Sequence, residues 1–236
     1  MTAWHDENKK KCVALLSGGM DSTTLVYKLI AEGWDVKVLS IDYGQRHSRE
    51  LMCGDKIAKQ LKLFRKVVKI DLTQFGDSPL TNYETNIPLQ KENKQRNTVV
   101  GYRNTLFCTL AAAYAQTQNI RDLFIAPCAE DFKAYRDCRP EFYESLELSL
   151  PLGGTQEEWK VKIHTPFIRT YKRDIVALGK KLDPTLDLFL GSWSCYEGEE
   201  PSCGLCDACC ERISAFKDNG IKDPIRYGIN IDWDKK

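Results

Sequence analysis

The chain has 236 residues, with 34 basic and 33 acidic side chains and a formal net charge of +1. This length suits one large domain, or one domain with a small lobe. The near balance of charge gives no support for broad non-specific binding to nucleic acid and leaves a local basic patch as the alternative. The polar N-terminal segment and the short apolar runs contain no signal peptide and no membrane-spanning stretch. We therefore expect a cytoplasmic protein with no membrane partner and no direct nucleic-acid partner.

Short apolar runs alternate with helix-like segments along most of the chain. Because the strands alternate with helices of ten or more residues, the pattern predicts an α/β fold with a doubly wound parallel sheet. A polar stretch with two prolines, residues 75–98, is expected to be a lid or a partly ordered loop. The predicted strands are 11–16, 36–43, 66–71, 122–127 and 160–165, and the predicted helices are 23–33, 50–61, 104–117, 140–150, 172–182 and 207–219.

A glycine-rich turn, SGGMDS at residues 17–22, joins the first predicted strand to the first helix. Glycines let the backbone approach a phosphate, and a helix N-terminus offers unpaired N–H groups and a positive dipole end. Asp21 would be misplaced beside phosphates unless Mg²⁺ lay between them. The alternative is a serine-capped turn with no ligand. The predicted ATP-binding residues here are Leu16, Ser17, Gly18, Gly19, Met20, Asp21, Ser22 and Thr23.

Five of the ten cysteines crowd into residues 195–210, and the other five are scattered and are interpreted as small buried apolar residues. Spacings of seven, two and two residues allow four thiolates to close a tetrahedral, structural Zn²⁺ site. Redox cysteines and an iron–sulfur cluster are the alternatives. Cys210 is left out because Cys209 completes the Cys-x-x-Cys spacing. The predicted ligands are Cys195, Cys203, Cys206 and Cys209. We expect residues 1–190 to form the α/β domain and 191–236 a zinc-binding lobe packed on it.

The glycine-rich turn resembles the pyrophosphatase loop of the N-type ATP pyrophosphatases. These enzymes cleave ATP to AMP and pyrophosphate while they adenylate a substrate oxygen. The order of the further motifs resembles the 7-cyano-7-deazaguanine synthase family from about Lys11 to Tyr227. These motifs are residues 42–47, 103–104, 137–142 and 220–225, together with the four clustered cysteines.

The resemblance implies an ATP-dependent C–N ligase of queuosine biosynthesis. It would convert 7-carboxy-7-deazaguanine and ammonia to 7-cyano-7-deazaguanine (preQ0) through an adenylated intermediate. Adenylation turns a carboxylate oxygen into a leaving group, and ammonia displaces AMP to give an amide. A second activation, of the amide oxygen, allows that oxygen to leave and the nitrile to form. The implied cofactors are ATP, Mg²⁺ and Zn²⁺, and the implied assembly is a homodimer.

The resemblance also assigns roles to single residues. Gln45 would join the ATP-binding residues at the end of the second strand. Three of these residues also have a structural interpretation. His47 would then be a solvated loop histidine, Asn104 a helix cap, and Lys172 a solvated lysine at a helix start. Which of His47 and Lys172 is catalytic stays open. The implied catalytic residues are Asp21, Ser22, His47, Arg103 and Lys172, and the implied substrate-binding residues are Arg103, Asn104, Asp131, Tyr135, Asp137 and Arg139.

Two segments depart from the family pattern. Residues 133–136 read KAYR where the family has Ser-Gly-Tyr-Pro, and residues 99–102 read VVGY where it has Val-Pro-Gly or Val-Pro-Ala. A runner-up function is therefore a relative from a phage or defence cassette that joins the activated deazaguanine to a different acceptor. A tRNA-modifying pyrophosphatase would need a basic extension that this chain lacks. A nucleotide-binding module without turnover is the non-enzymatic alternative.

Overall fold

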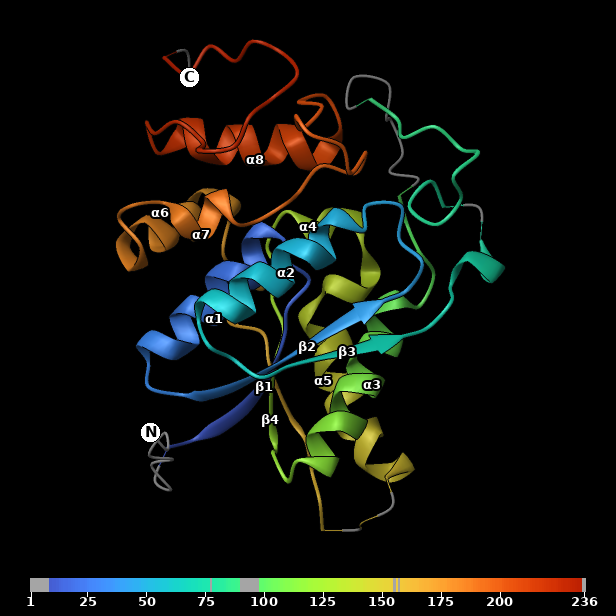
Figure 1. The fold of residues 1–236 in the computed structure, drawn as a ribbon. Coiled ribbons are helices and arrows are strands. Elements are labelled where there is room, and N and C mark those ends of the chain that lie inside the picture. The colour runs from blue at the N-terminus through green and yellow to red at the C-terminus, as the bar shows by residue number, and fades with distance from the viewer. Residues whose placement is uncertain (1–8, 77, 90–97, 155, 157, 235–236) are drawn as a thin grey trace.

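A five-stranded, fully parallel sheet forms the centre of the molecule (Figure 1). The computed structural model describes residues 9–76, 78–89, 98–154, 156 and 158–234, and only the backbone of Lys133 and Ala134. The predicted α/β fold is confirmed, and each predicted strand is present. The strands are β1 (Lys11–Leu15), β2 (Asp35–Asp42), β3 (Arg65–Lys69), β4 (Asp122–Phe124) and β5 (Lys162–His164).

The strand order is β3-β2-β1-β4-β5. The chain therefore runs from β1 to one edge of the sheet, returns, and builds the other edge with β4 and β5. A ligand site in such a sheet forms outside the carboxyl ends of the strands, where the direction of winding reverses. Here that point lies beside β1 and β4.

Helices cover both faces of the sheet, as Figure 1 shows. Every predicted helix is present within about three residues at each end, and the short α4, α7 and 3₁₀ turns add to them. The helices are α1 (Met20–Ala31), α2 (Arg49–Gln60), α3 (Arg103–Thr117), α4 (Asp131–Ala134), α5 (Pro140–Ser149), α6 (Lys172–Leu182), α7 (Asp187–Leu190) and α8 (Asp207–Asp218); the 3₁₀ turns are η1 (Thr73–Phe75), η2 (Arg136–Cys138) and η3 (Leu150–Gly153).

The alternation of side chains along the strands explains the two helix layers. In β1, Cys12 and Ala14 pack with α1 and α2, whereas Val13 packs with α3 and α5. Successive side chains of a strand point to opposite faces, so a strand buried on both sides reads as a continuous apolar run. Phe124 of β4 lies on the first face and Leu123 on the second.

The C-terminal segment packs on the edge of this core through α8 and α6. Phe216 of α8 meets Phe189 of α7 edge to face, with the ring centroids 5.0 Å apart. Arg212 is buried and forms two bonds to the buried carboxylate of Asp223, at 2.6 and 3.0 Å. A third bond, from Arg212 to the Phe189 carbonyl at 2.8 Å, ties α8 to the chain that leads to Cys195.

Two predictions concern parts of the chain that the structure describes incompletely. The predicted loop 75–98 lies partly outside the described residues, at 77 and 90–97, and the side chains of Lys133 and Ala134 in the departing segment also lie outside. In the described part of the chain, no helix combines the length and apolar character needed to cross a membrane.

Candidate active site

The turn after β1 is held in one conformation by its own side chains. The Ser17 hydroxyl lies 3.0 Å from that of Ser22 and accepts a bond from the Gly19 N–H at 3.0 Å. Gly18 has φ +101°, and a Cβ there would lie 2.0 Å from the Glu50 carbonyl oxygen. Only glycine fits this position, because it tolerates positive φ and because α2 approaches the turn so closely.

Helix α1 begins directly after this turn. Gly19 is its N-cap, and the Ser22 and Thr23 hydroxyls both donate to the Gly19 carbonyl, at 3.1 and 2.8 Å. An α-helix leaves the N–H groups of its first turn without intrahelical partners, and these groups with the dipole favour an anion. A helix N-terminus after a glycine turn is a common phosphate site.

Asp21 stands in the first turn of α1 with a buried carboxylate oxygen, Oδ1, that has no hydrogen-bond partner among the described residues. Burial, with the nearby carboxylates Asp131, Glu211 and Glu130, raises the pKa of Asp21 to about 7, although Lys172 acts in the opposite direction. A buried carboxylate without a donor suits a hard cation such as Mg²⁺, which takes oxygen ligands. The predicted Mg²⁺ site therefore fits the residues present.

A cavity of about 280 Å³ opens beside this turn, at the carboxyl ends of β1 and β4. Eleven of the predicted residues line it, although they come from six separate parts of the chain. Those residues are Ser17, Gly19, Met20, Asp21, Ser22, His47, Arg103, Asn104, Asp131, Tyr135 and Lys172; those that do not line it are Leu16, Gly18, Thr23, Gln45, Asp137 and Arg139.

The residues outside the lining serve the local structure. The Leu16 side chain is in the core. The Gln45 carboxamide accepts from the Tyr43 N–H at 2.8 Å and is itself buried, so it supports the loop after β2. Asp137 accepts from the Asn104 N–H at 3.4 Å, and the Asn104 side chain donates to the Asp137 carbonyl at 3.2 Å. Arg139 donates to the Phe132 carbonyl at 3.4 Å.

Two cationic side chains reach the cavity. Lys172, the first residue of α6, lies 2.5 Å from a carboxylate oxygen of Glu211 on α8. Burial alone would lower the pKa of Lys172, but Asp131, Glu211 and Asp21 raise it well above its ordinary value. Arg103, the first residue of α3, donates to the Tyr43 hydroxyl at 3.5 Å. Both groups are therefore positively charged at neutral pH, as anion binding requires.

Two further lining residues, Asp131 and Tyr135, carry groups suited to a heterocycle. Asp131 holds a position fixed by the Cys128 backbone N–H, which donates to its carboxylate at 3.2 Å. The Tyr135 hydroxyl lies 3.0 Å from that of Thr98. A carboxylate and an aromatic ring in one wall match a planar base that presents N–H donors.

His47 and Glu50 lie next to each other at the N-terminus of α2. The His47 Nε2 lies 3.2 Å from a Glu50 carboxylate oxygen, and both residues line the cavity. Burial would raise the pKa of Glu50, but its hydrogen bond to His47, with further help from Ser17 and Arg103, lowers it. The sequence prediction included His47 and missed Glu50. Glu50 follows His47 by three residues at the start of a predicted helix, and this spacing was a usable signal.

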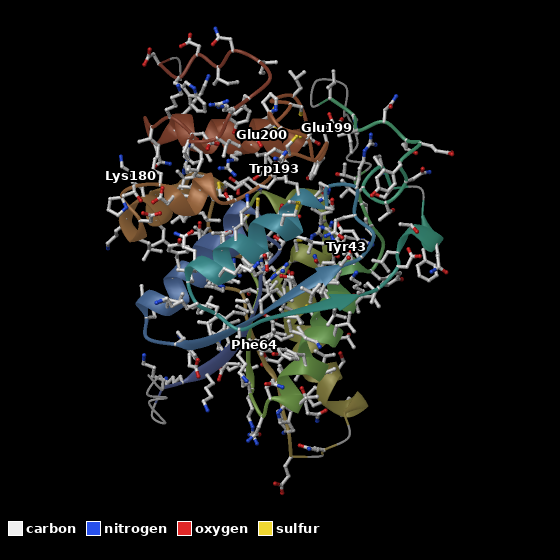
Figure 2. All side chains as sticks on the ribbon, in the orientation of Figure 1. Tyr43, Phe64, Lys180, Trp193, Glu199 and Glu200 are labelled. Carbon is white, nitrogen blue, oxygen red and sulfur yellow. The ribbon has the colours of Figure 1, made fainter. Side chains whose placement is uncertain are left out.

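The chain before the cysteines also reaches the site, which the sequence prediction missed. Trp193 donates its backbone N–H to the Gly18 carbonyl at 2.9 Å, and Trp193, Ser194 and Tyr196 line the cavity. Figure 2 shows Trp193 between α8 and the layer of α1 and α2. The C-terminal segment is therefore one wall of the site.

The structure brings the four predicted cysteine ligands together. The Sγ atoms of Cys195, Cys203, Cys206 and Cys209 all lie within 4.8 Å of one another. Cys203 Sγ and Cys209 Sγ are 3.8 Å apart, and ligands about 2.3 Å from a tetrahedral zinc would be separated by about 3.8 Å. Cys210 instead directs its thiol to the carbonyls of Gly204 and Leu205.

Backbone donors also support this cluster. The Leu205 and Cys206 N–H groups point at Cys203 Sγ, both at 3.4 Å. The neighbouring thiols and the Leu205 donor lower the pKa of Cys203. A lowered pKa favours the thiolate, which is the form that ligates metals. The donor set fits a metal that prefers four sulfur ligands.

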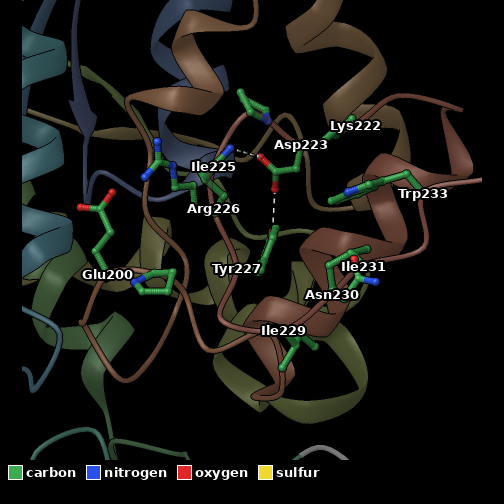
Figure 3. A pocket seen from close by; sticks show the side chains of 12 residues that line it. Glu200, Lys222, Asp223, Ile225, Arg226, Tyr227, Ile229, Asn230, Ile231 and Trp233 are labelled. Carbon is green, nitrogen blue, oxygen red and sulfur yellow. Dashed lines mark hydrogen bonds between the residues drawn. The ribbon is translucent and has the colours of Figure 1, made fainter.

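A larger cavity, of about 730 Å³, lies in the C-terminal segment around residues 222–233. Figure 3 shows its carboxylate, Asp223, bonded to the Tyr227 hydroxyl and the Ile225 N–H, at 2.7 and 3.2 Å. The same carboxylate forms an ion pair with Arg212. The smaller cavity, whose lining includes Asp21 and His47, each with a buried polar atom that has no partner among the described residues, is the better candidate active site.

The chain is similar to several known proteins. Residues 11–220 match the family described as queuosine biosynthesis protein QueC. The 7-cyano-7-deazaguanine synthase of Thermoplasma volcanium is 40% identical over 92% of this chain and 91% of its own, and that of Caldicellulosiruptor saccharolyticus is 40% identical over 96% and 99%. Among solved structures, NMN synthetase from Francisella tularensis is 16% identical, with a TM-score of 0.47 over 91% of this chain and 79% of its own.

Proposed function

Because this chain belongs to the QueC family of queuosine biosynthesis proteins, we propose that it converts 7-carboxy-7-deazaguanine and ammonia to 7-cyano-7-deazaguanine with ATP, through an adenylated intermediate. One observation carries the proposal. A single cavity at the reversal point of the sheet joins the phosphate turn, two cations and a base-binding wall. Substrate and nucleotide held together there would react without a bimolecular encounter.

The phosphates would bind at the turn of residues 17–22. The free N–H groups of the first turn of α1 would donate to the pyrophosphate oxygens, and the Ser22 hydroxyl would do so after turning away from the Gly19 carbonyl. Lys172 and Arg103 would balance the negative charge that builds up as the bond between the α- and β-phosphates breaks. The turn is already rigid, so this stabilisation requires little rearrangement.

Mg²⁺ would be held by Asp21, whose Oδ1 is the buried oxygen without a partner. When bound, the ion supplies positive charge that stabilises the departing pyrophosphate. Asp21 itself must be ionised to hold it, and the cation would bring the pKa of the carboxyl back down.

The deazaguanine would bind against Asp131 and Tyr135. A guanine-like edge presents adjacent N–H donors, which an ionised carboxylate accepts. Tyr135 supplies an aromatic surface for the plane of the base. Asp137, Asn104 and Arg139, which were predicted to bind the base as well, would act by fixing the start of α3 and the turn around Phe132.

The four clustered cysteines would hold Zn²⁺ in a structural role. Four thiolates fill a tetrahedral site and leave no position for a substrate. Because Trp193, Ser194 and Tyr196 line the cavity and Cys195 lies between Ser194 and Tyr196, the metal would keep that wall in place. A homodimer remains part of the proposal.

The test is to incubate the protein with Mg²⁺, ATP, ammonium and the carboxy-deazaguanine and to follow AMP and base products by mass spectrometry. The proposal predicts the nitrile and AMP, with loss of both in Asp21→Asn. Asp55→Asn, which removes a half-exposed carboxylate of α2 outside the cavity, is the matched control and should retain activity. AMP without the nitrile would point to another acceptor, and no acid-dependent AMP would contradict the proposal.

A further inference from the structure

His47 and Glu50 form an isolated histidine–carboxylate pair in the wall of the cavity. His47 is only 6% exposed, and its Nε2 lies 3.2 Å from the Glu50 carboxylate. The other ring nitrogen, Nδ1, is buried and has no partner among the described residues. A buried ring nitrogen without a partner is uncommon in folded proteins, so it calls for an explanation.

The pair fixes the tautomer of the imidazole. An ionised Glu50 only accepts hydrogen bonds, so His47 donates from Nε2–H and keeps the lone pair on Nδ1. The Ser17 hydroxyl and the charge of Arg103 help to keep Glu50 ionised. The Tyr196 ring, centred 5.9 Å from the imidazole, covers another side. This arrangement leaves Nδ1 as the basic atom of the ring, with an oriented carboxylate on the other side.

The proposed reaction needs such a base, because each bond made by nitrogen releases a proton. Lys172 cannot serve, since the surrounding carboxylates hold it protonated. Asp21 is committed to the phosphate side of the cavity. We propose that His47 accepts these protons at Nδ1, with Glu50 as its positioning residue, and thereby acts on the nitrogen in both halves of the reaction. This inference rests on the proposed function.

The first half releases one proton from nitrogen, and the second half releases two. In the first, the ammonia lone pair forms the C–N bond, the C–O bond to AMP breaks with its electron pair, and one N–H proton passes to His47. In the second, the amide oxygen attacks the α-phosphate of ATP, pyrophosphate leaves, and one N–H proton passes to solvent, which gives the neutral adenylated imidate. Its N–H proton passes to His47, the electron pair of that bond forms the third C–N bond, and the C–O bond to AMP breaks. Between the two, His47 must return its proton to solvent.

The experiment separates adenylation from nitrogen transfer. Exchange of labelled pyrophosphate into ATP, with the carboxy-deazaguanine present and ammonia absent, reports adenylation alone. Amide plus nitrile formation with ammonium reports nitrogen transfer. His47→Gln keeps a donor toward Glu50 but has no basic lone pair, so we expect exchange within about threefold of the wild type. Product formation should fall by about 10²- to 10⁴-fold, the range of general acid–base catalysis.

Glu50→Gln provides a second variant. It should lower product formation less than His47→Gln and move the acidic limb of the pH–rate profile to lower pH, because the imidazolium loses its counter-charge. The control is His164→Gln, since His164 also pairs with a carboxylate, Asp122, at 2.6 Å but does not line the cavity. It should leave both rates unchanged.

Three outcomes would overturn the inference. Exchange and product formation that fall together in His47→Gln would show a structural role. Unchanged product formation in that variant would show that another base acts. If the acidic limb of the pH–rate profile stays in place in Glu50→Gln, Glu50 does not act as the positioning residue of His47. A wild-type protein without acid-dependent exchange would contradict the proposed function, and the role of His47 would fall with it.

Discussion

Replacing Asp21 by asparagine should stabilise the ligand-free protein while it abolishes nucleotide use. Asp21 is an acid whose pKa is raised on folding, from 3.8 to about 7, first by burial and then by nearby carboxylates. The folded state therefore holds this proton more tightly than the unfolded state. The resulting penalty is absent below pH 3.8, grows as the pH rises toward 7, and is complete above about pH 7.

The magnitude follows from the pKa change. At about 1.4 kcal/mol per pKa unit, the ionised carboxylate destabilises the ligand-free fold by about 4 kcal/mol above pH 7. At pH 5 the penalty is already roughly 1–2 kcal/mol, so the difference between pH 5 and pH 8 is about 3 kcal/mol. For a chain of this size that corresponds to a change in Tm of about 6–12 °C. Asparagine has nearly the same shape and no charge, so it removes the penalty.

The assay is thermal unfolding of wild type and Asp21→Asn at pH 5 and pH 8, without ligand and with Mg–ATP. The Tm advantage of the variant should grow from pH 5 to pH 8. Mg–ATP should raise the Tm of the wild type and have little effect on the variant. A variant less stable than wild type at pH 8, or an advantage independent of pH, would refute the account of Asp21 as a buried carboxylate that awaits a cation.

Three further changes test other parts of the structure. Gly18→Ala should lower the free energy of unfolding by about 2–5 kcal/mol in urea titrations, since its Cβ would meet the Glu50 carbonyl at a positive-φ position; wild-type stability would contradict this. Arg212→Leu leaves the buried Asp223 carboxylate without its ion-pair partner and should cost about 3–5 kcal/mol, whereas replacing both by leucine should cost less in the same titration. Cys203→Ser should lower the bound zinc, measured by mass spectrometry of the metal, from about one per chain; undiminished zinc would exclude the four-cysteine site.

The sheet and its helices could be predicted from the sequence because their signals are local. The apolar runs of β1 and β2 end at glycine or polar residues, and the helix patterns between them exceed ten residues. Short elements such as α4 and η2 were missed, since four residues cannot show a helical period. Their positions depend on contacts with α3 and on the Cys128–Asp131 bond, which no local pattern records.

The candidate site also has parts that local sequence patterns predict and parts that depend on contacts between distant segments. The glycine-rich turn and the four clustered cysteines have fixed spacings: the turn lies between β1 and α1 as predicted, and the four Sγ atoms lie within 4.8 Å of one another. Gln45 was predicted at the site because it follows a strand, yet its carboxamide is taken by the backbone at Tyr43. Glu50 and Trp193 reach the cavity only because α2 and the C-terminal segment pack against the turn at Gly18. Packing between distant segments is not visible in one sequence.

The central claim is that the nitrogen of ammonia becomes the nitrile nitrogen of the deazaguanine. The direct measurement is the mass of the base recovered after the protein has acted on the carboxy-deazaguanine with Mg–ATP and ¹⁵N-labelled ammonium. We predict the nitrile carrying one ¹⁵N, formed only when ATP is present and accompanied by AMP. Recovery of the unchanged acid, or of an ATP-independent product without ¹⁵N, would contradict the account.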